Sequence, residues 1–329
     1  MLIRFTPKVN LEDVGTVTAR CDAVNVQYKY IQEMSTSWLV VESLDRPKIE
    51  ELNHQLRHLD FVESIYLPDD PGDPFDKIDE VKIKCGNRWL SKNSRPVIFA
   101  GSPYLESQKH SVDFSATLSG LGVHVFKAGP YRPTETLDVK SLYERAGSIV
   151  HAVWGRSKIP STLMIEALGP RTALSSLKPC AFHVPGKFMF DTGLMDQMAK
   201  LMMPVLLERH PDASTSLWLD MAREIVATGN FSVALLETGR NIAGDMQIDF
   251  AELTHLIDTC PLPIIVYASR IATSASQVGM LARASLAAGA AGIMLDVHPN
   301  PLEGLLSDGF CLSLRELEEM TDSLIDLCK

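Results

Sequence analysis

The chain has 329 residues, of which 46% are hydrophobic, and a formal net charge of -10 at pH 7. This length and composition predict a globular protein with a large core, and acidic and basic residues are too evenly mixed to form a surface that neutralises nucleic-acid phosphates. The N-terminus has no apolar run after a basic segment, and no stretch reaches the roughly 18 apolar residues of a membrane span, so we expect a cytoplasmic protein without a membrane partner.

Strand and helix signals alternate through the first seventy residues in the order βαββαβ. The predicted strands are 1–7, 24–34, 38–43 and 62–68, and the predicted helices are 11–23 and 47–59. This order is that of the ferredoxin-like motif, which we assign to residues 1–70. Residues 71–94 begin with a stretch rich in Pro, Asp and Gly and are predicted to be a linker.

Short apolar runs alternate with helical segments from Arg95 to the end of the chain. Eight runs are predicted to be strands: 96–101, 123–129, 163–169, 181–186, 204–209, 233–239, 263–269 and 292–298. Nearly continuous apolar strands alternating with helices favour a parallel sheet with covered faces, and eight such units predict an α/β fold with a closed (β/α)8 barrel over residues 95–329. An open doubly wound sheet is the alternative, but no strand is followed by a glycine-rich nucleotide-binding turn.

Polar residues follow the predicted strands, where the reactive groups of a (β/α)8 barrel lie. These candidates carry both charges and would form a mixed mouth. They are Gly101 to Tyr104, Arg132, Glu166, Lys187, Glu208, Arg209, Glu237, Thr238, Ser269, Arg270, Asp296, His298 and Asp308. The six cysteines and nine histidines are dispersed without CxxC or His-rich spacing, so we expect neither a disulfide framework nor a structural zinc site.

Several segments resemble motifs of one enzyme family in the same order along the chain. They are FAGSPYLES, FKAGPYRP, MPVLLER, LLETG and, most specifically, AAGAAGIMLDVHPNPLEGLLSDGFCLSL. The chain thus resembles the DAHP synthases that carry an N-terminal ferredoxin-like regulatory domain, over essentially its whole length. The resemblance implies a barrel that condenses phosphoenolpyruvate with erythrose 4-phosphate, and an N-terminal domain that senses aromatic amino acids across subunit contacts. The alternative for this domain is a packing or oligomerising module.

The resemblance also implies a divalent metal held by a Cys, a His, a Glu and an Asp. These four positions are occupied here by Pro103, Arg270, Asp296 and Asp308. Proline has no donor atom and a guanidinium carries its own positive charge, so two carboxylates remain. Two are too few for a tight transition-metal site, and we expect no metal or other cofactor.

The implied anion site is altered in the same way. The family's cationic positions fall on Arg132, Lys187, Glu208 and Thr238, so the charge there falls from plus four to plus one. The loop for the second substrate is Arg132-Pro133-Thr134-Glu135-Thr136, which places a carboxylate where an anion docks. We therefore expect phosphoenolpyruvate to bind weakly.

Our leading hypothesis is a divergent DAHP synthase-like protein that has lost the condensation and binds a small anionic or aromatic ligand or a protein partner, in a homo-oligomer. We also expect the Arg270 guanidinium to take the place of the metal and to bridge Asp296 and Asp308, which would otherwise repel each other. The charged atoms would then approach to roughly 2.7–3.2 Å.

Two alternatives keep the chain an enzyme. In the first, a metal-independent aldolase or lyase uses Arg270 as an electrophile and Asp296, Glu208 or His298 as acid-base groups. In the second, the original condensation is retained with substituted ligands, for which Tyr104, Glu106 and His298 are near in sequence.

Overall fold

The computed structural model describes residues 1–6, 8–33, 36–42, 45–66, 73–131, 137–165, 174, 177–301 and 310–327. The predictions for Arg132 and its loop, for Glu166 and for Asp308 therefore lie outside the described residues. Within the described part of the chain, no helix is long and apolar enough to cross a membrane.

The N-terminal elements follow the predicted βαββαβ order. They are β1 (Leu2–Phe5), α1 (Leu11–Ala23), β2 (Gln27–Glu33), β3 (Thr36–Glu42), α2 (Arg46–Leu56) and β4 (Val62–Tyr66). The strands form an antiparallel sheet in the order β2-β3-β1-β4. Helix α1 begins where Asn10 accepts hydrogen bonds from the backbone of Glu12 and Asp13. A separate apolar core, which includes Ile3 and Phe5, lies beneath the two helices.

Eight parallel strands close into the predicted barrel. They are β7 (Val97–Gly101), β8 (Val125–Ala128), β9 (Ser161–Met164), β10 (Ala181–Val184), β11 (Val205–Glu208), β12 (Val233–Glu237), β15 (Ile264–Tyr267) and β16 (Gly292–Asp296). The closed order is β10-β11-β12-β15-β16-β7-β8-β9. Seven strands lie within the predicted ranges, and β9 begins two residues before its predicted start. The (β/α)8 fold is therefore confirmed.

Helices cover the outside of the barrel. They are α3 (Gln108–Gly120), α4 (Val139–Ser157), α6 (Thr192–Leu201), α7 (Thr215–Ala227), α8 (Phe250–Thr259), α9 (Ala268–Ile271), α10 (Ala275–Ala287) and α11 (Leu314–Leu327). Short elements complete the description: the 3-10 helices η1 (Pro74–Lys77) and η2 (Gly186–Phe188), and two hairpins, β5 (Ile83–Cys85) with β6 (Arg88–Leu90) and β13 (Arg240–Ile242) with β14 (Asp245–Gln247).

Two segments differ from the sequence prediction. The predicted linker contains η1 and the β5–β6 hairpin, because Ile83 and Leu90 are buried in the core that the barrel shares. The predicted strand 263–269 ends at Tyr267, where the chain turns directly into α9. This turn places Arg270 on a short helix instead of beyond the end of a strand.

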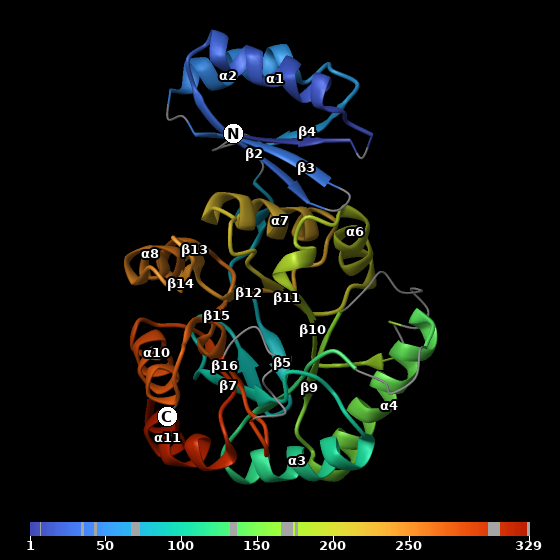
Figure 1. Ribbon diagram of the computed structural model, residues 1–329, viewed down its shortest axis with the longest axis vertical. Helices are drawn as coiled ribbons and strands as arrows, with labels where there is room; N and C mark the ends of the chain where they lie inside the picture. The colour runs from blue at the N-terminus through green and yellow to red at the C-terminus, as the bar shows by residue number, and fades with distance from the viewer. Residues whose placement is uncertain are drawn as a thin grey trace.

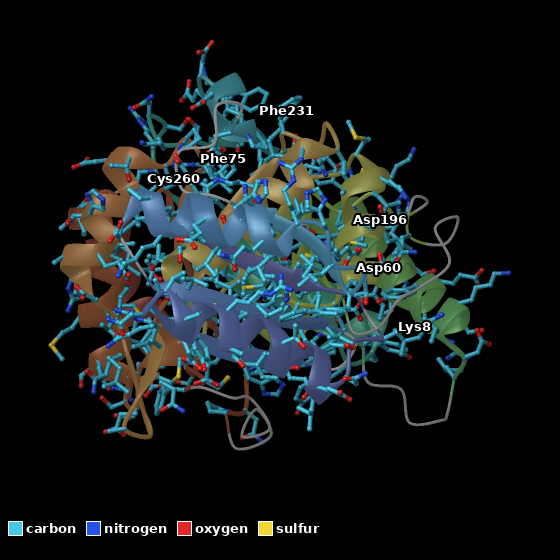
Figure 2. All side chains as sticks on the ribbon, turned by 90° about the horizontal axis from the view of Figure 1, so that it is seen from above. Lys8, Asp60, Phe75, Asp196, Phe231 and Cys260 are labelled. Carbon is cyan, nitrogen blue, oxygen red and sulfur yellow. The ribbon has the colours of Figure 1, made fainter. Side chains whose placement is uncertain are left out.

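The N-terminal sheet faces helices α6 and α7, with α1 and α2 on its far side (Figure 1). Arg4 Nη1 lies 2.7–2.8 Å from the two carboxylate oxygens of Glu224 on α7, and Trp38 joins the apolar core of the barrel. Figure 2 shows the N-terminal elements from above, lying across the middle of the molecule over the barrel. Arg223 on α7 also stacks on Phe75 of η1, with its guanidinium carbon 4.7 Å from the ring centroid.

Candidate functional site at the barrel mouth

Five barrel strands bring buried polar side chains to the mouth. Lys127 comes from β8, His183 from β10, Glu208 from β11, Tyr267 from β15 and Asp296 from β16, and all five are buried. Parallel strands present their carboxyl ends to the same rim, so residues distant in sequence meet there. A β-carbon at Gly101 would collide with the backbone of Lys127, so glycine allows the ends of β7 and β8 to approach closely.

A buried ion pair joins Lys127 to Asp296. The Lys127 ammonium donates a hydrogen bond to Asp296 Oδ1 and another, of 3.2 Å, to the carbonyl oxygen of Ser102. The Tyr267 hydroxyl donates to the same Asp296 oxygen at 2.7 Å. Burial, followed by the charge of Asp296, raises the pKa of Tyr267 well above its ordinary value, so the phenol keeps its proton. Lys127 thus supplies the positive charge beside Asp296.

His183 and Glu208 form a second buried pair. His183 Nε2 lies 2.6 Å from Glu208 Oε2, and the histidine side chain is 0% exposed. Burial lowers the pKa of His183 more than the carboxylate raises it, so the ring is neutral and donates its Nε2 proton. Burial alone would raise the pKa of Glu208, but the charge of Arg270 and the hydrogen bond from His183 outweigh it, and this pKa lies below its ordinary value.

Arg270 lies beside these pairs. Its guanidinium carbon is 5.3 Å from the Tyr267 ring centroid, and the Lys127 ammonium is 5.4 Å from the same centroid. The predicted hydrogen bond from Arg270 to Asp296 is not found in the described structure: Asp296 Oδ1 accepts from Lys127 and Tyr267, and Asp296 Oδ2 is buried without a hydrogen-bond partner. The other half of the bridge, between Arg270 and Asp308, lies outside the described residues.

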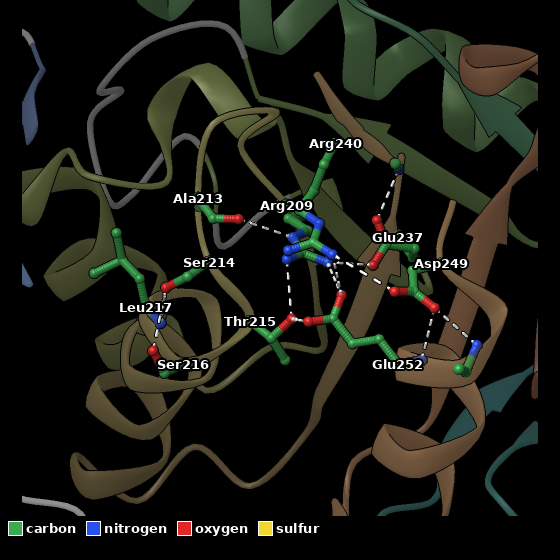
Figure 3. A network of polar contacts seen from close by, with 12 residues as sticks. Arg209, Ala213, Ser214, Thr215, Ser216, Leu217, Glu237, Arg240, Asp249 and Glu252 are labelled. Atoms are coloured by element: carbon green, nitrogen blue, oxygen red, sulfur yellow. Dashed lines mark hydrogen bonds and ion pairs between the residues drawn. The ribbon is translucent and has the colours of Figure 1, made fainter. Parts of the chain in front are cut away.

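Arg209 belongs to a neighbouring polar network (Figure 3). Its guanidinium donates to Ala213 O at 3.1 Å, to Thr215 Oγ1 at 2.9 Å and to Glu237 Oε2 at 2.8 Å. The Thr238 hydroxyl donates to Arg209 O at 3.0 Å. These three predicted substrate-binding residues, Arg209, Glu237 and Thr238, therefore bind one another and the following loop, and this arrangement supports a structural role for them.

Lys187 and Pro103 do not contribute charged groups to the buried cluster. Lys187 is exposed on η2, with its ammonium 4.9 Å from the Phe188 ring centroid. Pro103 is buried but has no donor atom in its side chain. Together with the Lys127 ammonium on Asp296 Oδ1 and the cationic Arg270, this argues against a divalent ion at the described family positions, whereas the buried Asp296 Oδ2, which has no hydrogen-bond partner in the described structure, is an atom that a cation could contact.

A cluster with metal-binding chemistry does lie nearby. His298 Nε2 is 2.7 Å from Glu106 Oε1, and the ligand atoms of Glu106, His110 and His298 all lie within 4.8 Å of one another. The expectation that this chain holds no metal considered only the four positions of the family's metal ligands and does not extend to this cluster. His110 was not predicted from the sequence, in which only its position four residues after Glu106 indicated that the two side chains could meet where α3 begins.

A cavity of about 1020 Å³ lies against α4 and the β5–β6 hairpin, lined in part by Lys84, His151 and Trp154. None of the buried mouth residues lines it. The mouth remains the candidate functional site because the described charged side chains of the barrel interior converge there.

Three comparisons relate the chain to known proteins. Residues 80–329 match the model of the DAHP synthetase I family. The phospho-2-dehydro-3-deoxyheptonate aldolase of Thermotoga maritima is 25% identical over 98% of this chain and 98% of its own length. A 2-dehydro-3-deoxyphosphooctonate aldolase of Synechococcus is 23% identical over 74% of this chain and 93% of its own length. A crystal structure of the Thermotoga maritima DAHP synthase aligns with a TM-score of 0.69 and 21% identity, covering 99% of this chain and 96% of that chain.

Proposed function

Because the chain belongs to the DAHP synthetase I family, we propose that it uses the family's barrel mouth to bind a small ligand and does not catalyse the metal-dependent condensation. The buried Lys127–Asp296 ion pair is the observation on which this proposal rests. A metal ion bound at the family's position would share Asp296 with a resident ammonium group. The repulsion between a divalent ion and an ammonium a few ångströms away is strong where both are shielded from water.

The charge balance at the mouth supports the same conclusion for phosphoenolpyruvate. Lys127 and Arg270 carry positive charges, Glu208 and Asp296 carry negative charges, and His183 is neutral, so the described groups sum to zero. A phosphate dianion needs several donors from cations or backbone amides to offset its desolvation. A ligand with at most one negative charge, or a neutral aromatic one, suits this balance better.

The test uses the full chain with phosphoenolpyruvate and erythrose 4-phosphate, after chelation and then with added manganese, zinc or cobalt. We expect no formation of the seven-carbon product with any metal, and calorimetry should show phosphoenolpyruvate binding no tighter than millimolar. Turnover that requires a metal, or micromolar affinity, would overturn the proposal.

A matched pair of variants separates local from overall charge. Glu208→Gln removes the negative charge at the mouth and should tighten phosphoenolpyruvate binding by about tenfold, the effect of removing one repulsive interaction of about 1.4 kcal/mol. Glu318→Gln removes an exposed carboxylate on α11 and should leave that affinity unchanged.

The His183–Glu208 pair favours a second candidate, a metal-independent aldolase or lyase. The Glu208 carboxylate orients the neutral imidazole of His183, and the Nδ1 atom of His183 is buried without a hydrogen-bond partner in the described structure. A nitrogen in this state can accept a proton from a substrate. Incubation of the metal-free protein with pyruvate and a panel of aldehydes, followed by NMR, tests this candidate. It predicts turnover that falls at least about 100-fold in His183→Gln, as expected when a general base is removed.

A further inference from the structure

We propose that Glu106, His110 and His298 bind one divalent first-row transition-metal ion, with zinc as the first candidate. Each side chain offers one ligand atom, and the three atoms lie within 4.8 Å of one another. None of the three residues occupies a position where the resemblance to DAHP synthases places a metal ligand. The proposal is therefore independent of what happens at Asp296.

Two adjacent connections of the barrel hold the three residues. Glu106 lies between β7 and α3, and His110 lies in the first turn of α3, where its backbone amide donates to the capping Ser107 hydroxyl at 3.2 Å. His298 follows β16, and its backbone amide donates to Leu312 O at 2.9 Å. Strands β16 and β7 pair in the barrel, so the two connections leave the sheet side by side. These two backbone hydrogen bonds position His110 and His298 without any contribution from an ion.

His298 has polar partners at both ring nitrogens. Its Nδ1 atom lies 2.6 Å from the carbonyl oxygen of Asn300 and also 3.1 Å from the Asn300 backbone N–H, so either tautomer of the ring finds a partner there. The other nitrogen, Nε2, lies 2.7 Å from Glu106 Oε1. When Nδ1 accepts from Asn300, Nε2 carries the proton of this contact. When Nδ1 donates to Asn300, as metal-binding histidines usually donate their second ring N–H to a carbonyl, Nε2 has a lone pair that can bind a metal ion.

His110 supplies the third ligand, and its ring makes few other polar contacts in the described structure. The ring stacks on that of His298, with centroids 5.6 Å apart and planes at 22°. Its Nδ1 atom lies 3.7 Å from Glu106 Oε2, which is too long for a hydrogen bond. Its Nε2 atom is buried and has no hydrogen-bond partner among the described residues.

Two imidazoles and one carboxylate are the protein ligands of open zinc sites, in which water or a substrate fills the fourth position. Ligands about 2.0–2.1 Å from a tetrahedral ion are about 3.3 Å apart, and the distances from His298 Nε2 to Glu106 Oε1, 2.7 Å, and from His110 Nδ1 to Glu106 Oε2, 3.7 Å, lie on either side of this value. The His298 side chain is 1% exposed, whereas Glu106 and His110 are each 30% exposed. The cluster therefore has a buried floor and an entrance open to solvent.

The experiment strips the full chain with a chelator and titrates it with zinc, or with cobalt as a coloured substitute. We expect one equivalent to bind and cobalt to give visible absorption bands without a thiolate charge-transfer band in the near ultraviolet. His110→Leu and Glu106→Gln should each lower the affinity at least about tenfold, since even the loss of a residue that only supports a ligand costs 10–100-fold. Circular dichroism checks that both variants fold.

The matched control is the double variant His54→Ala, His58→Ala, which removes an exposed histidine pair on and after α2 whose ring centroids are 6.2 Å apart. It should bind metal as the unmodified chain does. Failure of the unmodified chain to bind metal, unchanged affinity in His110→Leu, loss of binding in the control, or a thiolate band would each overturn the proposal. No substrate is present, so the result does not depend on the proposed function.

Discussion

Replacement of Lys127 by methionine tests the central ion pair of the barrel mouth. Methionine keeps most of the length of the side chain and removes its charge, which leaves the Asp296 carboxylate buried with Tyr267 as its one remaining side-chain donor among the described residues. The side chains of Lys127 and Asp296 are each 1% exposed, so water cannot replace the lost ammonium without rearrangement. Removing one partner of such a pair destabilises a protein by about 3–5 kcal/mol.

Urea unfolding, monitored by fluorescence, measures the loss in free energy of unfolding, and calorimetry measures the midpoint of thermal unfolding. At about 2–4 °C per kcal/mol, the midpoint of thermal unfolding should fall by about 6–20 °C. Lys140→Met is the control, because its ammonium lies 3.7 Å from Glu144 and its side chain is 64% exposed. This exposed pair should contribute less than about 1 kcal/mol.

A second change separates loss of the pair from loss of packing. Adding Asp296→Asn to Lys127→Met removes the unpaired charge and retains an oxygen that accepts from Tyr267, so most of the lost stability should return. The reasoning is refuted if Lys127→Met costs no more than Lys140→Met, or if the double variant is as unstable as the single one.

Three further perturbations test other described contacts. Burial, then the charge of Arg88, lowers the pKa of His124 to about 4, so the stability that the neutral ring contributes is complete above pH 6.5 and is lost as the pH falls toward 4. In His124→Gln, the free energy of unfolding should therefore fall by about 2 kcal/mol less between pH 7 and pH 4 than in the unmodified chain, after allowance for partial exposure, as measured by urea unfolding. Burial raises the pKa of Asp220 to about 6 although Arg223 lies 2.9 Å away, so the stability that the protonated carboxyl contributes is complete below pH 4 and is lost as the pH rises through 6. In the same assay, Asp220→Asn should raise the free energy of unfolding by about 1–3 kcal/mol at pH 7 and leave it unchanged at pH 4. Arg4→Met should speed hydrogen exchange in the N-terminal sheet, and unchanged exchange would show that the contact with α7 contributes nothing.

The barrel strands could be predicted because burial on both faces leaves a simple signal. Most of the strands are short apolar runs, four of them end at glycine or at a charged residue, and seven of the eight lie within the predicted ranges. The start of β9 was predicted two residues too late because its first residues, Ser161 and Thr162, are buried hydroxyl residues that do not extend an apolar run. The end of β15 was missed because a one-turn helix is too short to show periodicity.

The mouth was harder to predict, because a sequence shows which residues end a strand but not which way they point. Lys127 and His183 lie inside apolar runs, before the ends that were considered, and both point into the barrel as central members of its buried pairs. A lone basic residue inside an apolar barrel strand was the signal available for each. Arg209 follows a strand as a ligand-binding residue would, but its guanidinium binds the loop after β11 and Glu237.

The same geometry explains how the barrel can do without an ion beside Asp296. A buried carboxylate without a partner costs several kcal/mol, so loss of a metal from this position would destabilise the fold unless another cation replaced it. Lys127 supplies a positive charge beside Asp296, and because it belongs to the chain this charge does not depend on metal supply. Glu106 and His298 sit beyond the strand ends and pair with each other without any contribution from Lys127. The Lys127–Asp296 pair between β8 and β16 and the proposed metal ligands Glu106, His110 and His298 are therefore separate features of this mouth, and each can be altered by mutation without removing the other.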